Sequence, residues 1–473
     1  MFERHARGRA LGLVPVAVCF VVAGLTLLWA RQPTYDPYSW LVWARQLAGE
    51  SQVAFSSAGA SGWKPLPVLV ALPFNWLGGD AAPIWLVWVA RTAMLLLPVA
   101  AWRLGRLAAG VPGAVAAALS TLLLPAAFTY VGGLAEPAVG LMLMIAVIYV
   151  IQDQPGRAWV AGLVAVLGRP EALAAVVPWG AWETAKRRLS VIWFTAGVIV
   201  TSLLWAGGDW IGTGQPLGLL GKADKSKEPE RIQAAANPGL EILKGLHLGL
   251  VIYAIAIATF IAAWIWRDQV SRLLGLVVVA LVGSTVVATQ FVGYPGVTRY
   301  LVPAVPLILA LVGVGIGRVG NLPQNPWLKA GLTAALLAIL FAVAGPETLR
   351  SDRSTEAWYR THDRYSEQLA GAISAAGGRQ RLLQCGRFTT QPRPQVSAAA
   401  WMLDVQLKEV LRGGTDAIER SNTPMAIALA DAYLPAFRAR VKRSGLRAVR
   451  IARSPNWTVW SVTSGPGGPC VRS

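Results

Sequence analysis

Ionisable residues next to long apolar runs are the part of this sequence where chemistry is most readily recognised. They are Asp36, Lys64, Glu136, Arg169, Glu171 and Arg299. A carboxylate can take the proton of an attacking hydroxyl, and cations can hold a phosphate group on which negative charge develops. The aromatic residues Tyr35, Trp63 and Tyr300 stand beside these charges and can stack on sugar rings. The set therefore fits transfer chemistry on a lipid phosphate at one side of a membrane.

Most of these charged residues also have a simpler structural explanation, which the sequence leaves open. Asp36 can lie in a turn or cap a helix, and Lys64 can extend its ammonium group toward a membrane interface. Glu136 can stabilise the N-terminus of a helix. Arg169 and Glu171 can form a structural ion pair, although ionisable groups at membrane depth are functional candidates by default.

The elements that must position these residues are membrane helices. The chain has 473 residues, of which 55% are hydrophobic and 14% charged, whereas a soluble domain carries roughly 25% charged residues. Many apolar runs are about 20 residues long, which is the length that crosses a bilayer. This composition excludes a soluble enzyme, a secreted disulfide scaffold and a disordered chain, and predicts a multi-pass protein of the cell membrane.

The net charge of +19 does not indicate nucleic-acid binding here, because cytoplasmic loops of membrane proteins retain Lys and Arg. Basic residues at positions 4, 7 and 9 place the N-terminus inside. The first apolar run, about 11–30, has no small-residue cleavage site after it, and we expect a retained helix. Arg299 begins a membrane helix from the outside, against this charge bias; an interfacial anchor is the alternative explanation for it.

Following the basic residues along the chain gives about eleven membrane segments. Trp-rich Ser39–Leu47 suits a helix that lies in the interface. Arg157 and the basic cluster at 186–188 both suit the cytoplasm, yet the stretch between them is too short for two crossings. Two short helices that meet inside the protein around Gly168–Glu171 fit better, which predicts a re-entrant pair.

Composition changes at Pro346, which predicts a membrane domain over 1–346 and a polar domain over 347–473 outside the membrane. In the second domain we expect helices at about 353–376 and 395–411 and strands at 381–385, 446–452 and 456–462, typical of a small α/β layer. Cys385 and Cys470 would share an oxidising space, and the sequence leaves open whether they pair. Six arginines between 438 and 453 suit an anionic acceptor or anionic headgroups.

Several motif matches fail on their context. Gly315–Gly320 has the spacing of a dinucleotide-binding loop but closes a membrane helix instead of opening one, so packing between small residues explains it better. The three histidines and three cysteines are scattered and form no ligand cluster. We predict neither a metal nor a cofactor.

The order of the remaining motifs resembles the GT-C superfamily of polytopic glycosyltransferases, which includes protein O-mannosyltransferases, the aminoarabinose transferase of lipid A and actinobacterial mannosyl- and arabinosyltransferases. The resemblance covers about residues 10–345. It rests on Asp36 in the first outer loop, Lys64-Pro65 before the next helix and the short helix pair with Arg-Pro-Glu. Two further parts are Asp209-Trp210 with Thr213–Leu217, and Arg299–Pro303.

The resemblance implies a polyprenyl-phosphate sugar donor and inverting transfer to an extracytoplasmic acceptor, which would be a glycolipid, a cell-wall polysaccharide or a protein. Asp36 would be the catalytic base, with Arg299, Lys64 and Tyr300 at the donor phosphate. Sugar or acceptor would contact Glu136, Arg169, Glu171, Tyr35 and Trp63. Many members have two adjacent acids in the first loop, whereas Pro37 follows Asp36 here.

Two other classes of function are compatible with a polytopic chain. A transporter or flippase of lipid-linked or anionic substrates is the main alternative, although such proteins often have repeated halves and no repeat is visible here. A non-catalytic scaffold whose tail binds a cell-wall polymer is the weaker one. The clustering of charges toward one face of the membrane favours the glycosyltransferase.

Overall fold

The computed structural model describes residues 2–49, 62–76, 81–214, 232–246, 248–292, 294, 296–392, 395–411, 416 and 424–463. The chain divides into two compact units. We call Met1–Leu28, Trp88–Ala206 and Leu219–Ala357 the helical unit, and Trp29–Val87, Gly207–Gly218 and Trp358–Ser473 the mixed unit. The predicted division at 346 differs from this partition, because the segment after the first helix groups with the C-terminal residues.

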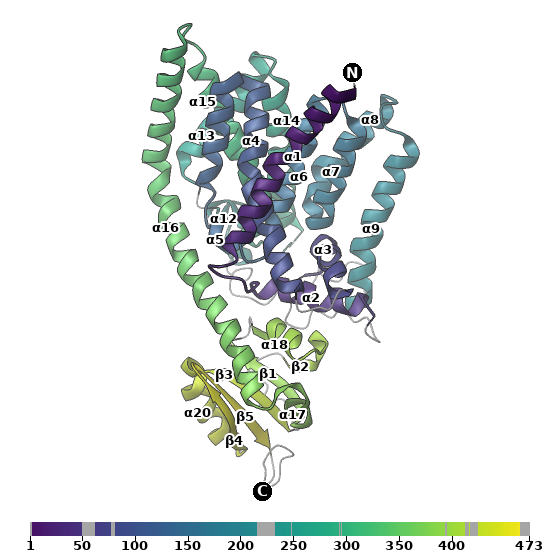
Figure 1. Cartoon of the computed structure of the whole chain (residues 1–473), viewed down its shortest axis with the longest axis vertical. Coiled ribbons are helices and arrows are strands. Elements are labelled where there is room, and N and C mark those ends of the chain that lie inside the picture. Colours follow the sequence, from purple (N-terminus) through teal and green to yellow (C-terminus); the bar gives the residue numbers. More distant parts are fainter. Residues whose placement is uncertain are drawn as a thin grey trace. The chain divides into compact units, whose positions relative to one another are not determined.

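Helices of the expected apolar composition make up the helical unit. They are α1 (Phe2–Thr26), α4 (Ala82–Ser120), α5 (Ala127–Tyr130), α6 (Glu136–Ile151), α7 (Pro155–Gly168), α8 (Leu173–Ala185), α9 (Val191–Thr213), α12 (Pro238–Lys244), α13 (Leu250–Ile265), α14 (Gln269–Phe291), α15 (Val305–Gly320) and α16 (Pro326–Ala375). Three of these helices belong to both units: α4 begins in the mixed unit, and α9 and α16 end in it. Figure 1 shows these elements in chain order.

Five helical segments of the described residues are long and apolar enough to cross a membrane, in agreement with a multi-pass membrane protein. They are Ala82–Leu123, Val191–Ile211, Gln269–Phe291, Thr298–Gly320 and Pro326–Ala375. Shorter apolar helices accompany them, among them α6, α7 and α13. The predicted number of about eleven membrane segments stays a prediction.

Helix α15 lies at the centre of the helical unit, since nearly all of its residues are buried. Its small residues explain the close packing: a Cβ at Gly313 would stand 2.3 Å from the Cα of Ala117, and one at Gly317 would stand 2.2 Å from the Cα of Gly113. Small residues spaced four apart let two helix backbones approach closely. This confirms that the glycine-rich segment serves helix packing.

The short helix pair predicted around Gly168–Glu171 is present. Helix α7 ends at Gly168, a single 3-10 turn (η2) spans Pro170–Ala172, and α8 follows from Leu173. Each helix is shorter than the ~20 residues that cross a bilayer, with 14 residues in α7 and 13 in α8. Arg169 between them is only 3% exposed, so the turn is buried in protein. Its re-entrant placement in a membrane remains a prediction.

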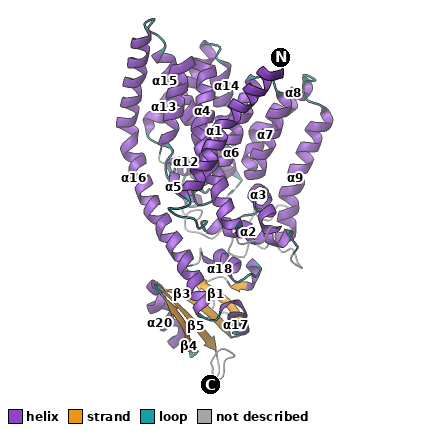
Figure 2. Ribbon diagram, viewed as in Figure 1, coloured by secondary structure: helices purple, strands orange, loops and turns teal. Residues whose placement is uncertain are grey.

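The mixed unit contains a small α/β fold, as predicted for the C-terminal residues. Five strands pair in the order β2-β1-β3-β5-β4, formed by Arg387–Gln391 (β1), Val410–Leu411 (β2), Met425–Ala430 (β3), Arg447–Ser454 (β4) and Trp457–Thr463 (β5). Strands β2, β1 and β3 are parallel, and β5 and β4 complete the sheet in antiparallel pairs. Figure 2 shows that the strands are confined to this part of the chain.

Helices cover both faces of the sheet. Helix α20 (Leu434–Ser444) packs on one face through Phe437, whose ring lies 5.4 Å from that of Trp460. On the other face Trp457 meets Tyr365, from the C-terminal part of α16, at 6.1 Å between ring centroids. Alternate residues of β5 thus contact different helices, as expected for side chains that alternate along a strand.

Three details of the predicted C-terminal domain are wrong. The helix expected at about 395–411 ends at Met402 as α18 (Val396–Met402), and Val410–Leu411 form strand β2. Residues 378–384 form helix α17 (Gly378–Gln384), and the strand begins only at Arg387. A short apolar run does not distinguish a strand from a buried helix. Helix α16 also continues without a break through Pro346. Cys385 is disulfide-bonded, whereas Cys470 lies outside the described residues.

Candidate functional site

A buried ion pair forms the centre of the predicted site residues in the helical unit. Arg169, in the turn between α7 and α8, donates a hydrogen bond to Glu136 at the start of α6. Both side chains are almost inaccessible, at 4% and 0% exposure. The second carboxylate, Glu171, lies 3.9 Å from the Arg169 guanidinium. The structural ion pair that the sequence left open is therefore present, and it joins two helices that are consecutive along the chain.

Two tyrosines extend this network to the segment before α15. The hydroxyl of Tyr294 donates to Glu171 at 2.8 Å, and the guanidinium of Arg169 lies 4.4 Å from the centroid of the Tyr300 ring. The two tyrosine rings are 5.3 Å apart. In addition, Gln233 donates to the backbone carbonyl of Tyr294 at 2.7 Å. The network therefore fixes both ends of the segment that carries Arg299.

Arg299 lies in the 3-10 helix η3 (Thr298–Ala304), one residue before Tyr300, and is half-buried. Arg299 and Arg169 are near enough for their positive charges to repel each other. Arg169 is neutralised by two carboxylates, while Arg299 is less buried. A guanidinium in this setting can bind a phosphate group through two parallel hydrogen bonds.

The remaining predicted site residues belong to the mixed unit. Asp36 stands in the first turn of helix α2 (Tyr35–Leu47) and is only 1% exposed. The partial positive charge at a helix N-terminus stabilises a carboxylate there. Although the sequence predicts an interfacial helix, most residues of α2 are buried, because helices α3 (Pro65–Trp76) and α18 (Val396–Met402) pack against it.

Lys64 lies near the same face of α2 as Asp36. Its ammonium group is 4.9 Å from the ring centroid of Trp40, which follows Asp36 by one helical turn and so shares its face. The Lys64 residue is 4% exposed. A buried lysine beside an aromatic ring and a carboxylate-bearing helix face is a candidate for holding a phosphate oxygen.

Trp63, the residue before Lys64, packs its ring on helix α2. Its ring lies 5.7 Å from that of Trp43, one turn beyond Trp40 on α2. A Cβ at Gly208 would stand 2.2 Å from the Trp63 ring, so only glycine fits there. The next residue, Asp209, is a second buried carboxylate in the mixed unit, at 6% exposure. The sequence indicates Asp209 only as part of the Asp209-Trp210 motif and predicts no separate role for it.

Tyr35 contacts the C-terminal part of α16. Its ring is 6.3 Å from His362 in an edge-on arrangement, and His362 stacks on Trp358 at 5.4 Å. Gln395 lies 3.3 Å from the Nδ1 atom of His362. These contacts join the residue next to Asp36 to the segment that leads into the α/β fold.

The structure thus groups the predicted residues into two sets. Glu136, Arg169, Glu171, Arg299 and Tyr300 form one set in the helical unit, and Asp36, Lys64, Tyr35 and Trp63 belong to the mixed unit. Sequence reasoning missed Tyr294 and His362. Tyr294 lies five positions before Arg299 in the sequence, and this closeness was a usable signal. No signal indicated His362, because the scattered histidines have no spacing pattern. Among the described residues no group of three or more His, Cys, Asp or Glu is placed to hold a metal ion.

Comparison with known proteins identifies the fold. No family model and no curated protein sequence matches the chain. Solved structures do match, and they share the fold of this chain, which confirms the GT-C-like fold class that the sequence predicts.

Two proteins are represented among the similar structures. ArnT from Cupriavidus metallidurans in the apo state has a TM-score of 0.55 at 13% identity, covering 98% of this chain and 100% of that chain. ArnT bound to undecaprenyl phosphate has the same TM-score at 14% identity, covering 96% of this chain and 98% of that chain. A third structure is the oligosaccharyltransferase AglB from Archaeoglobus fulgidus, in complex with an inhibitory peptide and a dolichol-phosphate. Its TM-score is 0.52 at 9% identity, and the match covers 92% of this chain and 71% of that chain.

Proposed function

We propose that this protein is a membrane glycosyltransferase that moves a sugar from a polyprenyl-phosphate donor to an extracytoplasmic acceptor, with inversion at the anomeric carbon. The observation that carries the proposal is a GT-C fold shared over nearly the whole chain with a protein bound to undecaprenyl phosphate. The buried Asp36 at the N-terminus of α2 supports it, because a carboxylate there can serve as a base.

The proposed reaction uses the residues of this chain as follows. Asp36 accepts the proton of the acceptor hydroxyl, and the hydroxyl oxygen forms a bond to the anomeric carbon of the donor sugar. The bond from that carbon to the phosphate oxygen breaks, and polyprenyl phosphate leaves with the electron pair. Arg299 and Lys64 stabilise the charge that develops on the leaving phosphate. Attack opposite the leaving group inverts the configuration.

The other predicted residues belong to the same proposal. Tyr300 accompanies Arg299 at the donor phosphate, and Tyr35 and Trp63 offer aromatic faces for a sugar ring. Glu136, Arg169 and Glu171 are proposed at the sugar or acceptor side. Since Arg169 and Glu136 are buried and paired, we infer that their contribution is to hold the neighbouring tyrosines and Arg299 in place. Residues 347–473 are proposed to lie outside the membrane.

A reconstituted transfer assay tests the proposal. Purified protein in proteoliposomes is given polyprenyl-phosphate-linked sugars one at a time, and release of polyprenyl phosphate is followed together with formation of glycosylated product. We expect release to depend on the protein and on one class of sugar. A lipid and polysaccharide extract from a deletion strain would show which glycoconjugate disappears. Movement of intact lipid-linked sugar across the bilayer without release of polyprenyl phosphate would support the flippase instead.

A further inference from the structure

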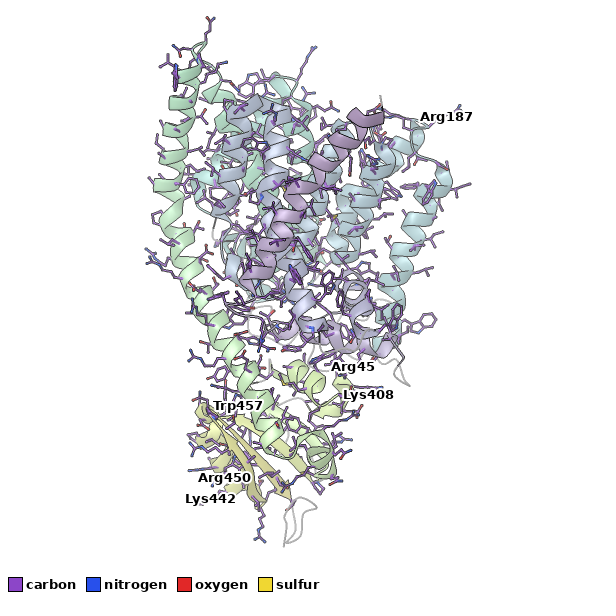
Figure 3. All side chains as sticks on the ribbon, in the orientation of Figure 1. Arg45, Arg187, Lys408, Lys442, Arg450 and Trp457 are labelled. Carbon is purple, nitrogen blue, oxygen red and sulfur yellow. The ribbon has the colours of Figure 1, made fainter. Side chains whose placement is uncertain are left out.

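A group of exposed cations lies on the α20 side of the C-terminal sheet. Arg438 and Lys442 on α20 are exposed, as are Arg450 and Arg453 on β4. We call these four residues the basic face. Figure 3 labels Lys442 and Arg450, whose side chains project at the edge of the sheet.

The two cations of α20 lie on one flank of that helix. Helix α20 packs on the sheet through Leu434, Phe437 and Val441. With 3.6 residues per turn, Arg438 and Lys442 fall on one flank of this apolar stripe and Arg440 on the other. Arg440 forms an ion pair with Asp416, which lies in the chain between β2 and β3. Helix α20 ends at Ser444 and β4 begins at Arg447, so this short connection keeps Lys442 near the start of β4.

A β-bulge brings the two cations of β4 to this same face. Arg450 pairs with Trp460, and Arg453 pairs with Thr458. Trp460 contacts Phe437 of α20, and residues directly opposite each other share a face of the sheet. Residues three apart in a regular strand point to opposite faces. The register shift between Arg450 and Ala452 removes that difference, so both guanidinium groups lie on the α20 side.

The basic face has little internal neutralisation. Among the described residues, Arg453 lies 3.7 Å from Asp431, and no ion pair involves Arg438, Lys442 or Arg450. Four cations with one acidic neighbour therefore leave a positive surface on a rigid helix and strand. Such a surface attracts anions.

The character of the surface indicates which anion it fits. Three of the four cations are arginines, whose planar fork binds carboxylate or phosphate through two hydrogen bonds. A protein surface that enters a bilayer carries large apolar side chains, and among the described residues none after Trp358 exposes one. We propose that the basic face binds a soluble, linear anionic glycan with carboxylate or phosphate groups along its length. The choice of a glycan rests on the proposed function, whereas the binding itself does not require the transfer reaction and is measured separately.

A binding measurement on the full-length protein tests the inference. The protein in nanodiscs of zwitterionic lipid is titrated into fluorescently labelled alginate oligosaccharide, with neutral dextran as the negative ligand. The test variant is Arg438→Gln/Lys442→Gln/Arg450→Gln. Its matched control is Arg103→Gln/Arg106→Gln/Arg187→Gln, which removes the same formal charge from exposed positions of the helical unit. Arg187 is labelled in Figure 3.

We expect the test variant to bind alginate at least about tenfold more weakly, with a shallower dependence of affinity on salt, because fewer ions are released on binding. The control should change affinity less than about twofold. Arg450→Lys alone keeps the charge but loses the fork, and should weaken binding a few-fold. If the triple variant is unstable, Arg450→Gln alone carries the test.

Three results would overturn the inference. The first is an equal loss of affinity in the test and control variants, which would mean that net charge alone matters. The second is no binding of alginate by the unmodified protein. The third is that vesicles containing phosphatidylglycerol compete fully for the basic face while alginate does not, which would assign the surface to a membrane.

Discussion

Arginine has opposite environments in the two units of this protein. Arg169 in the helical unit is buried, bonded to Glu136 and close to Glu171. Arg450 in the mixed unit is exposed and forms no ion pair among the described residues. A buried charge must be compensated by partners, so it fixes the geometry around it. An exposed charge is solvated and acts on whatever approaches. Arg169 therefore serves structure, whereas recognition is the role that we propose for Arg450.

The buried acids allow a similar comparison. Glu136 is committed to Arg169, which joins it to the turn between α7 and α8. Asp36 stands at the N-terminus of α2, where the helix itself stabilises its charge. We therefore expect loss of the Glu136 carboxylate to affect folding and loss of the Asp36 carboxylate to affect reaction rate.

The largest effect is expected for Asp36→Asn. The amide keeps the size of the side chain but cannot accept the proton, so turnover should fall by about 10²- to 10⁴-fold. Thermal stability and donor binding should change little. The matched control is Asp153→Asn, at an exposed acid of the helical unit, which should retain full turnover. Near-normal turnover of a folded Asp36→Asn protein would contradict the role as base.

Arg169→Ala should give the largest loss of stability. It leaves Glu136 buried without its partner, which costs about 3–5 kcal/mol in comparable buried pairs. Detergent-solubilised protein should then melt at a lower temperature or fail to accumulate. Arg450→Ala serves as the control and should melt like the unmodified protein. Equal melting of both variants would show that the comparison between buried and exposed arginine is wrong.

Two substitutions of Arg299 distinguish the effect of its positive charge from that of its two parallel hydrogen bonds. Arg299→Ala should weaken binding of polyprenyl phosphate by roughly tenfold to a hundredfold, since a hydrogen bond to a charged group contributes about 1.5–3 kcal/mol. Arg299→Lys keeps the charge but not the bidentate fork and should lie between Ala and the unmodified protein. Affinity can be measured by titration with the carrier phosphate in detergent. Unchanged affinity in both variants would remove Arg299 from the donor site.

The smallest effect is expected for Tyr294→Phe. This change removes the hydrogen bond to Glu171 and should reduce stability by about 1 kcal/mol. Because the bond holds the segment that carries Arg299, donor affinity should also fall a few-fold. The control is Tyr253→Phe, whose hydroxyl is buried without a hydrogen-bond partner among the described residues. If both variants behave alike, the Tyr294 bond does not position Arg299.

Much of the fold followed from local patterns. Apolar runs of membrane-crossing length, the short interval between Arg157 and the basic cluster at 186–188, and the polar tail gave the membrane class, the helix pair and the α/β layer. These features depend on residue spacing within one element, which the sequence displays directly. The GT-C fold rested on the order of several weak motifs, and the structure confirms it.

Details that depend on neighbouring elements could not be predicted. The helix at 378–384 replaced a predicted strand because a short apolar run suits either state until its packing is known. Helix α2 is buried because α3 and α18 pack on it, and α18 lies more than 300 positions later in the chain.

The sequence by itself determined that charged residues stand at the ends of membrane helices and that arginines crowd the C-terminal segment, because these are properties of composition and order. Only the tertiary structure decided that Arg169 bonds Glu136, which is 33 positions away, while its near neighbour Glu171 receives the Tyr294 hydroxyl. Only the register of β4 on β5 brought Arg450 and Arg453 to one face. Ion pairs and faces depend on distances between segments that the order of residues does not contain.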